Sequence, residues 1–358
     1  EENENNEDFY FLDGPPFTSG RMHCGTAWGK LLKDSFLRYY RMNGYNVLDT
    51  PGYDTHGLPI EVKVEQENDF ETKQDIVDYG VENFVEECKE YVYDQKSVMD
   101  EEFQDMGVWM DWDNPYLTMN SEYMNTVWSA FYELYMKDLV GRGFDVLNTC
   151  PRCETTLSDS ELDYGHRTIE AAYVEFPLTN MRGSVVAWTT TPWTVTGNQF
   201  VAVDKDLSYA RVVDEKSDAV YYVAEECVEN LVEKLSLNSY SVEETLKGSE
   251  LIGAEYEHPL EGKMSSLPRD SFNIENADYV EAEKTGFVHS APGYGHEDYE
   301  RGNELNLSPY SPVNSNGRFS EDLPNYSGLY VHDEGAEAVM EDLSENGYLL
   351  ATESYTHE

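Results

Sequence analysis

The sequence has few basic residues: 24 lysines and arginines stand against 71 aspartates and glutamates, giving a formal net charge of −47. The acidic residues are spread along the whole length among ordinary core-forming stretches, which argues against a disordered acidic tail. Self-repulsion of this size is tolerable when salt screens it, because the Debye length falls to about 3 Å at 1 M. The composition therefore predicts a halophile's protein. In molar salt, acidity does not exclude a nucleic-acid partner.

Long apolar runs and a cysteine framework are also missing. No apolar run approaches the ~20 residues that a membrane helix needs. The segment of residues 1–8 is rich in acidic side chains, whereas a signal peptide begins with a basic segment followed by an apolar one. Five cysteines, an odd number with one close pair, do not form a disulfide framework. These absences predict a cytoplasmic protein with no membrane partner. Because the chain starts at Glu1 without a methionine, we expect a fragment of a longer protein.

The N-terminal part has the pattern of a parallel α/β unit. Residues 9–13 and 45–50 are short apolar runs, and a helical pattern from about residue 22 to 43 lies between them. A strand, a helix and a second strand in this order are typical of the βαβ opening of a parallel sheet. Residues 70–106 are strongly charged and are also expected to be helical.

A change of pattern near residue 150 predicts a second domain. Before it, we expect a helix that Ser121 caps and that Gly141 and Gly143 end, followed by a strand at 144–147. After it come short apolar runs separated by Gly, Asn and Asp, at 172–176, 184–188, 200–203, 209–213 and 219–223. Recurrent short strands predict a β-rich domain inserted between parts of the first. Helical patterns return near 225–235, 296–305 and 334–346.

Two segments of the N-terminal part carry the strongest functional signal. Residues 14–20 (Gly-Pro-Pro-Phe-Thr-Ser-Gly) and 23–26 (His-Cys-Gly-Thr) connect the first strand to the first helix. The backbone N–H groups and the dipole at such a helix start favour an anion, so a phosphate site is predicted there. The second segment, residues 51–61, is Pro-Gly-Tyr-Asp-Thr-His-Gly-Leu-Pro-Ile-Glu. Alone it would indicate only a Gly/Pro-rich loop with a capping aspartate.

Together, in this order and spacing, the two segments resemble the N-terminal half of a class I aminoacyl-tRNA synthetase of the isoleucyl family. The leucyl family has G-x-D-x-F-G-L-P at the second segment and the valyl family has G-T-D-H-A-G, so residues 52–61 favour the isoleucyl form. Residues 107–116 also resemble that family. The resemblance implies an α/β fold: a Rossmann-like parallel sheet, the first half of the catalytic domain, with an inserted β-rich editing domain.

The resemblance also implies the residues of a synthetic site. His23 would contact the phosphates of ATP, and Gly25 would let the adenine lie against bare backbone. Thr26 stands where the family usually has a second histidine; its hydroxyl can still donate a hydrogen bond. The ATP site would comprise Pro16, His23, Gly25 and Thr26. The amino-acid site would comprise Gly14, Pro15, Asp54, His56, Gly57 and Glu61, with Asp54 binding the α-ammonium group in a cavity shared with His23.

A Cys-Pro-Arg-Cys segment at Cys150 and Cys153 has the spacing of a zinc knuckle, but zinc takes four ligands and the chain has no second close pair. Half of a zinc site, structural thiols and a redox pair all remain open. The resembling family has a small zinc-binding element near this position, whose other half would lie past residue 358. Zn²⁺ is therefore a candidate ligand here.

Two further segments resemble the editing domain of the isoleucyl, valyl and leucyl synthetases. Residues 188–194 (Trp-Thr-Thr-Thr-Pro-Trp-Thr) match a threonine-rich strand, and residues 286–298 match its partner loop. By the resemblance, Asp298 anchors the α-ammonium of a mischarged aminoacyl group, the threonine hydroxyls hold the ester and a water, and His289 excludes the larger side chain. The editing site would comprise Thr189, Thr190, Thr191, Thr194, Asn198, His289 and Asp298. Taken alone, the threonines indicate only a β-strand.

Residues 263–266 (Lys-Met-Ser-Ser) echo the K-M-S-K-S loop of class I synthesis sites. They lack the second lysine and lie between the two editing segments, so chance similarity is the better account. We expect the first half of the catalytic domain at 1–147 and a zinc-knuckle-like connection at 148–168. The inserted editing domain is expected at 169–345, and the return to the catalytic domain at 346–358.

The resemblance implies ATP-dependent activation of isoleucine, its transfer to tRNA(Ile), and hydrolytic editing of mischarged valyl-tRNA. ATP and Mg²⁺ would be the cofactors, tRNA(Ile) and isoleucine the partners, and the full-length enzyme would be a monomer. This piece alone would lack half of the nucleotide site. The alternatives are a free-standing hydrolase of mischarged aminoacyl-tRNA and, within the ligases, a valyl-tRNA synthetase.

Overall fold

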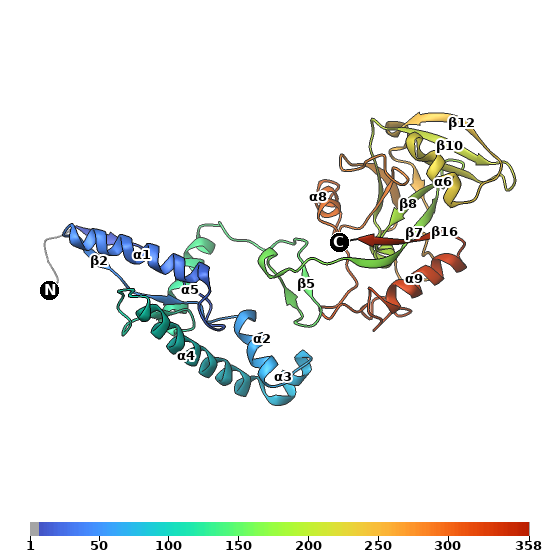
Figure 1. The fold of residues 1–358 in the computed structure, drawn as a ribbon. Helices are drawn as coiled ribbons and strands as arrows, with labels where there is room; N and C mark the ends of the chain where they lie inside the picture. The colour runs from blue at the N-terminus through green and yellow to red at the C-terminus, as the bar shows by residue number, and fades with distance from the viewer. Residues whose placement is uncertain (1–6, 358) are drawn as a thin grey trace. The chain divides into compact units, whose positions relative to one another are not determined.

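The computed structural model describes residues 7–357. The chain divides into two compact units, Glu1–Gly143 and Phe144–Glu358. In Figure 1 the first unit runs from blue to green, and the second unit runs from green through yellow to red. Within the described part of the chain, no helix is both long and apolar enough to cross a membrane.

The first unit opens with the predicted parallel βαβ arrangement. Strand β1 (Asp8–Tyr10) pairs in parallel with β2 (Asn46–Leu48), and helix α1 (Cys24–Met42) connects them. A second parallel pair joins β3 (Gly52–Tyr53) to β4 (Tyr116–Leu117). Between β3 and β4 lie α2 (Leu58–Glu67), α3 (Lys73–Tyr79) and α4 (Val81–Asp105). The predicted α/β class and the helical stretch at 70–106 are confirmed.

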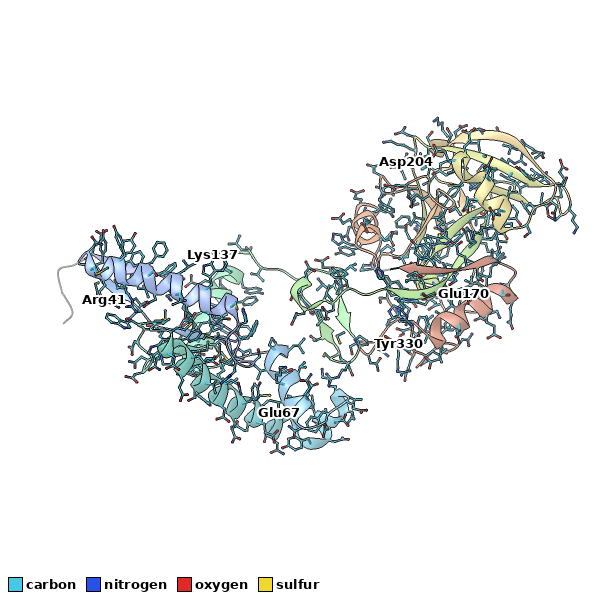
Figure 2. All side chains as sticks on the ribbon, viewed as in Figure 1. Arg41, Glu67, Lys137, Glu170, Asp204 and Tyr330 are labelled. Atoms are coloured by element: carbon cyan, nitrogen blue, oxygen red, sulfur yellow. The ribbon has the colours of Figure 1, made fainter. Side chains whose placement is uncertain are left out.

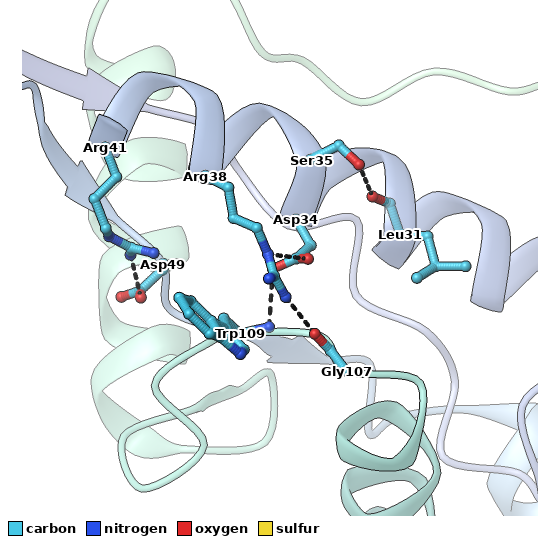
Figure 3. Close-up of polar contacts among 8 residues, drawn as sticks. All are labelled: Leu31, Asp34, Ser35, Arg38, Arg41, Asp49, Gly107 and Trp109. Atoms are coloured by element: carbon cyan, nitrogen blue, oxygen red, sulfur yellow. Dashed lines mark hydrogen bonds and ion pairs between the residues drawn. The ribbon is translucent and has the colours of Figure 1, made fainter. Parts of the chain in front are cut away.

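Polar contacts fix α1 to the segment that follows α4 (Figure 3). Asp34 accepts a hydrogen bond from the backbone N–H of Trp109 at 2.8 Å and pairs with Nε of Arg38 at 2.7 Å. The Arg38 guanidinium also lies over the Trp109 ring, 4.2 Å from its centre. Arg41 pairs with Asp49 at 2.6 Å, next to β2. These contacts explain why Asp34 is buried in the middle of a helix.

The helix after β4 differs from its prediction at both ends. Helix α5 runs from Ser121 to Met136, so Ser121 is its first residue and Asn120 occupies the cap position without a side-chain hydrogen bond. The helix ends before the glycines because Asp138 takes a left-handed conformation, with φ of 56°, and the N–H of Leu139 closes the turn onto the carbonyl of Leu134. The prediction of a strand at 144–147 is wrong, because these residues form no strand.

The second unit is β-rich, as predicted. Its six-stranded sheet has the order β12 (Tyr240–Lys247), β10 (Ser208–Asp214), β11 (Val220–Ala224), β8 (Ser184–Thr189), β7 (Arg167–Pro177), β16 (Leu349–His357). All its neighbours are antiparallel except β11 and β8. A four-stranded sheet has the order β13 (Glu255–Tyr256), β14 (Phe272–Asn276), β9 (Phe200–Val203), β15 (Val288–Ser290).

Short helices complete the second unit. They are η1 (Asp159–Glu161), η2 (Pro192–Gly197), η3 (Glu225–Cys227), α6 (Val228–Lys234), α7 (Gly248–Leu251), α8 (His296–Glu304) and α9 (Glu334–Glu345). A small hairpin of β5 (Thr149–Cys150) and β6 (Thr155–Thr156) precedes β7. The helices predicted near 225–235, 296–305 and 334–346 are confirmed. One large apolar core, which includes Tyr173, Phe176 and Tyr209, lies under the sheets.

The segment that we expect to begin the return to the catalytic domain contains strand β16 of this second unit. Strand β16 pairs with β7 along the edge of the six-stranded sheet, and the first residue of β7, Arg167, lies opposite the last residue of β16, His357. The start and the end of the β-rich sheet are therefore neighbours. A domain inserted into another chain segment needs this arrangement, because it must leave near where it enters.

Candidate functional site

Two cavities contain most of the predicted site residues, one in each unit. In the first unit, the Gly-Pro-Pro segment and the segment of Asp54 lie side by side. The N–H of Asp54 donates to the carbonyl of Pro16 at 2.8 Å, and the N–H of Thr18 donates to the carbonyl of Asp54 at 3.1 Å. The structure thus brings together two motifs that lie far apart in the sequence.

His23 caps α1. Its Nδ1 accepts hydrogen bonds from the backbone N–H groups of Gly25 at 3.1 Å and Thr26 at 3.3 Å. These two first-turn amides are therefore not free for an anion, contrary to the prediction. A Cβ on residue 25 would lie 2.9 Å from the His23 ring, so glycine allows the cap. With Nδ1 accepting, a neutral ring carries its proton on Nε2, which leaves one donor.

A cavity of about 350 Å³ lies beside this cap. Its lining includes the predicted residues Gly14, Pro16, His23, Gly25 and Thr26. It also includes Asp13, Lys30 and Lys33, which the sequence analysis did not select. His23, Lys30 and Lys33 stand at i, i+7 and i+10, a spacing that places them on one helix face. This spacing is a signal in the sequence from which the two lysines could have been predicted as site residues.

The lysines of this cavity are buried around Asp13, which itself is 7% exposed. Lys30 pairs with one carboxylate oxygen of Asp13, and Nζ of Lys33 lies 3.5 Å from the other. The Asp13 carboxylate also accepts the N–H of Gly52 at 2.8 Å, so it connects α1 to β3. Burial lowers the pKa of both lysines, and the Asp13 charge opposes this effect. The cavity therefore offers cationic groups in a strongly acidic protein.

The predicted amino-acid site is not assembled around this cavity. Asp54 is not among its lining residues, and Oδ1 of Asp54 accepts a hydrogen bond from the hydroxyl of Thr118 at 3.3 Å. His56 is exposed, and Gly57, with φ of 78°, precedes α2. Glu61 lies in the first turn of α2. The cavity lining also lacks Pro15, so only the predicted ATP-site residues and Gly14 share one cavity.

The second unit has a larger cavity, of about 980 Å³. Six of the seven predicted editing residues line it: Thr189, Thr190, Thr191, Thr194, His289 and Asp298. They come from the end of β8, from η2, from β15 and from the first turn of α8. Asn198, the seventh, is fully buried and is not among the lining residues. Segments that are separate in the sequence therefore converge on one cavity.

Asp298 is held by two donors at the edge of this cavity. The N–H of Ala291 donates to Oδ2 at 2.9 Å, and the hydroxyl of Tyr279 donates to Oδ1 at 3.1 Å. Burial raises the pKa of Asp298, and these hydrogen bonds oppose the rise. Each oxygen keeps a lone pair for a further donor. Tyr279 also lines the cavity, and no motif in the sequence singles it out.

His289 contacts the threonine segment directly. Its Nε2 lies 2.8 Å from Oγ1 of Thr194, and its Nδ1 lies 3.3 Å from Nδ2 of Asn198. Burial lowers the pKa of His289 to about 4, so the ring is neutral near pH 7. A neutral imidazole in this position can pack against a substrate side chain and hold Thr194.

The cysteine pair and the Lys-Met-Ser-Ser segment do not form sites of their own. Cys150 and Cys153 flank a tight turn in which the N–H of Cys153 donates to Sγ of Cys150 at 3.4 Å. Among the residues that the structure describes, no group of three or more metal-ligating side chains is present, so the two thiols do not form a complete zinc site. Lys263 pairs with Asp342 and Glu345 of α9, which gives it a structural role.

The fold and these residues define the class of protein. The sequence model of the family "tRNA synthetases class I (I, L, M and V)" matches residues 1–284, and the chain belongs to this family. It is 50% identical to the isoleucine–tRNA ligase of Haloquadratum walsbyi over 353 residues, which are 98% of this chain and 33% of that protein. It is also 50% identical to the isoleucine–tRNA ligase of Haloarcula marismortui over 351 residues, 97% of this chain and 33% of that protein.

The chain thus spans about a third of the length of these curated relatives. Among solved structures, "The crystal structure of GlLeuRS-CP1" is similar at a TM-score of 0.41 and 14% sequence identity. That match covers 53% of this chain and 99% of the other. The family membership predicted from the motifs is confirmed.

Proposed function

We propose that the whole protein activates isoleucine with ATP, transfers it to tRNA(Ile), and hydrolyses valyl-tRNA(Ile) formed in error. The observation that carries this proposal is the cavity of the second unit. There, four threonines, a neutral histidine and an anchored carboxylate line one space. The relatives' names support the ligase, and the converging motifs support the hydrolytic site.

The hydrolytic chemistry needs little more than positioning. An aminoacyl ester is already activated, so a held water can attack its carbonyl carbon while the ribose oxygen leaves with a proton. Asp298 would bind the α-ammonium group, because a buried cation requires an opposite charge. The threonine oxygens would hold the ester and the water, and His289 would exclude the larger isoleucyl side chain. A second selection step is useful because one methylene contributes only about 1–3 kcal/mol to discrimination.

We propose the cavity beside His23 as the nucleotide site. Nε2 of His23 and the buried ammonium groups of Lys30 and Lys33 would face the phosphates of ATP. The one carboxylate in the lining, Asp13, is already paired with both lysines, so Mg²⁺ would enter with the nucleotide. Asp54, held beside the Gly-Pro-Pro segment, would bind the ammonium group of isoleucine once further chain completes the pocket.

The arrangement of the second unit supports a domain inserted into a longer catalytic domain. Pairing of β7 with β16 brings its entry and its exit together. We therefore keep the proposed order of domains, with the first half of the catalytic domain at 1–147, a connection at 148–168, the editing domain at 169–345, and the start of the return at 346–358, whose strand β16 pairs with the entry strand β7. The two thiols of the connection fit at most half of a zinc site, and no step depends on them.

The charge supports a protein that works in molar salt. Side chains that end in oxygen atoms project from both units, and Glu67 and Glu170 are exposed examples (Figure 2). With 71 acidic residues, the folded chain repels itself in dilute buffer. We propose a halophilic cytoplasm as its environment.

Deacylation and pyrophosphate exchange test the proposal on the chain of 358 residues. We expect the chain to hydrolyse valyl-tRNA(Ile) faster than isoleucyl-tRNA(Ile) and to show no isoleucine-dependent exchange between ATP and pyrophosphate. Equal hydrolysis of both aminoacyl-tRNAs would contradict the editing proposal. Robust exchange would contradict the proposal that further chain completes the nucleotide site. Preferential hydrolysis of a mischarged tRNA other than tRNA(Ile) would favour the valyl enzyme or a hydrolase that acts in trans.

A further inference from the structure

The cavity of the second unit is lined by carboxylates and by a lysine. The acidic side chains of its lining are Asp145, Glu281, Glu283 and Asp298. Among the described residues of this lining, Lys284 is the one lysine or arginine. It lies in the loop between β14 and β15, and no motif in the sequence singles it out. The substrate proposed for this cavity is a nucleic acid with an anionic backbone, so Lys284 is a candidate contact for that backbone.

The backbone of Lys284 adopts a conformation that few residues with a side chain adopt. Its φ of 55° lies in the left-handed region, where a residue other than glycine is uncommon. The side-chain amide of Asn230 donates to the carbonyl of Lys284 at 2.9 Å, and the N–H of Gly286 closes the turn onto the carbonyl of Glu283. A left-handed residue that its surroundings hold in place is a reason to examine what its side chain does.

Contacts with Trp188 and with strand β16 fix the ammonium group of Lys284. Its Nζ donates to Oε1 of Glu353 at 2.7 Å. The same Nζ lies 4.6 Å from the centre of the Trp188 ring and 5.3 Å from that of Tyr355. These two rings contact each other edge to face, with their centres 5.1 Å apart. Because the faces of aromatic rings attract a cation, the rings and the carboxylate together hold the ammonium group in one place.

The carboxylate that holds Lys284 is shared with a second lysine. Oε2 of Glu353 pairs with Lys234, the last residue of α6. Burial raises the pKa of Glu353, but its hydrogen bonds to the two lysines and their charges outweigh burial and lower the pKa to about 2. Two ammonium groups therefore face one ionised carboxylate, and the cluster keeps a net positive charge. An ammonium group has three protons, so Lys284 keeps donors for an acceptor in the cavity.

The position of Lys284 suits the phosphate next to the proposed ester. Trp188, which contacts its ammonium group, directly precedes Thr189, the first of the threonines that would hold the ester and the water. In an aminoacyl-tRNA one ribose ring separates the ester from the last phosphodiester. The cavity, at about 980 Å³, is at the upper end of the range for ligand sites and has room for more than an aminoacyl group. The Lys284 side chain is 32% exposed, so a phosphate can reach it.

We propose that Lys284 binds the last phosphodiester of the aminoacyl-tRNA in this cavity, and that Glu353 and Tyr355 of β16 position its ammonium group. This inference rests on the proposed editing function and adds a contact for the nucleic acid to the residues that would hold the aminoacyl group. The contact is a charge-assisted hydrogen bond from Nζ to a phosphate oxygen. It would act in molar salt, because a partly buried charge pair is screened much less than an exposed one.

Substrates with and without this phosphate test the proposal on the chain of 358 residues in molar KCl. Valyl-adenosine has no phosphate, valyl-CpA has one, and the methylphosphonate analogue of valyl-CpA has an uncharged group in its place. The readout is kcat/KM for the hydrolysis of each ester by the wild-type chain, by Lys284→Gln and by Lys234→Gln. Lys234 is the matched control, because it pairs with the same carboxylate and is also 32% exposed, but does not line the cavity.

In the wild-type chain we expect kcat/KM for valyl-CpA to exceed that for its methylphosphonate analogue about tenfold, as for one hydrogen bond to a charged group. In Lys284→Gln this difference should disappear, while hydrolysis of valyl-adenosine stays at the wild-type value. Lys234→Gln should keep the difference, because molar salt screens a charge that does not contact the substrate.

Equal hydrolysis of valyl-CpA and its methylphosphonate analogue by the wild-type chain would overturn the proposal, whether or not Lys284→Gln folds. A Lys284→Gln variant that keeps the difference would also overturn it. So would a folded Lys284→Gln variant that loses as much activity on valyl-adenosine as on valyl-CpA, because the lysine would then act on the ester itself. A wild-type chain that hydrolyses none of the three esters would instead contradict the proposed function.

Discussion

Oγ1 of Thr194 lies 2.8 Å from Nε2 of His289, although 95 residues separate the two in the sequence. This contact joins the threonine-rich segment to the loop that carries Asp298. It also engages the ring nitrogen that a general base would need, and burial lowers the pKa of His289 to about 4. In the hydrolysis that we propose, the site would therefore act by positioning the substrate and the water.

The capping of α1 by His23 can be tested by hydrogen exchange at the two backbone amides that it binds. His23→Ala removes the acceptor for the N–H groups of Gly25 and Thr26, whereas His23→Asn keeps a good N-cap side chain. We expect faster hydrogen exchange at both amides in the alanine variant, consistent with a cap contribution of about 1 kcal/mol, and near wild-type exchange in the asparagine variant. Unchanged exchange in His23→Ala would contradict the capping role.

The buried pair of Lys30 and Asp13 should matter for stability. Lys30→Met leaves the Asp13 carboxylate buried with only the more distant Lys33, and we expect a loss of about 3–5 kcal/mol. The measurement is urea unfolding followed by far-ultraviolet circular dichroism.

The matched control for this pair is Lys89→Met. Lys89 pairs with Glu86 at 2.6 Å in an exposed position, so its loss should cost about 0–1 kcal/mol. The double variant Asp13→Asn/Lys30→Met should recover part of the stability, because it leaves no uncompensated charge. Equal losses of unfolding free energy in Lys30→Met and Lys89→Met would show that the buried pair contributes no more to stability than the exposed pair.

Local patterns predicted the first βαβ unit and the converging site segments, because apolar runs, Gly/Pro turns and threonine strands are encoded in neighbouring residues. The end of α5 was not predictable in this way, since the left-handed turn at Asp138 competes with the two later glycines. Tyr279 was missed for another reason. It comes from a segment without a motif, and only its hydrogen bond to Asp298, 19 residues further along the chain, ties it to the site.

Two buried histidines should make stability depend on pH. Burial lowers the pKa of His258 to about 3 and that of His289 to about 4, against about 6.5 in the unfolded chain. The unfolded chain binds more protons in this window, so each histidine makes stability fall as the pH falls below 6.5 towards the folded pKa. In His258→Gln, the slope of unfolding free energy against pH between about 6 and about 4.5 should decrease by about 1.4 kcal/mol per unit. Identical slopes in both proteins would contradict the assignment.

Salt should stabilise the fold. Raising KCl from about 0.1 M to above 1 M shortens the Debye length from about 10 Å to less than 3 Å and screens the net charge of −47. We expect the midpoint of thermal unfolding to rise steadily with KCl. Sucrose, which does not screen charge, serves as the control for preferential exclusion. A midpoint that responds to sucrose and not to KCl would contradict a role for self-repulsion.

The central claim, that the cavity of the second unit hydrolyses mischarged tRNA, is tested most directly by the deacylation of valyl-tRNA(Ile) by Asp298→Ala. The control is Glu297→Ala, which removes an exposed neighbouring carboxylate on the same helix. We predict that Asp298→Ala loses roughly a hundredfold in kcat/KM, the equivalent of about 3 kcal/mol for a desolvated charge pair, and that Glu297→Ala stays at the wild-type value. Undiminished deacylation by Asp298→Ala would contradict the account.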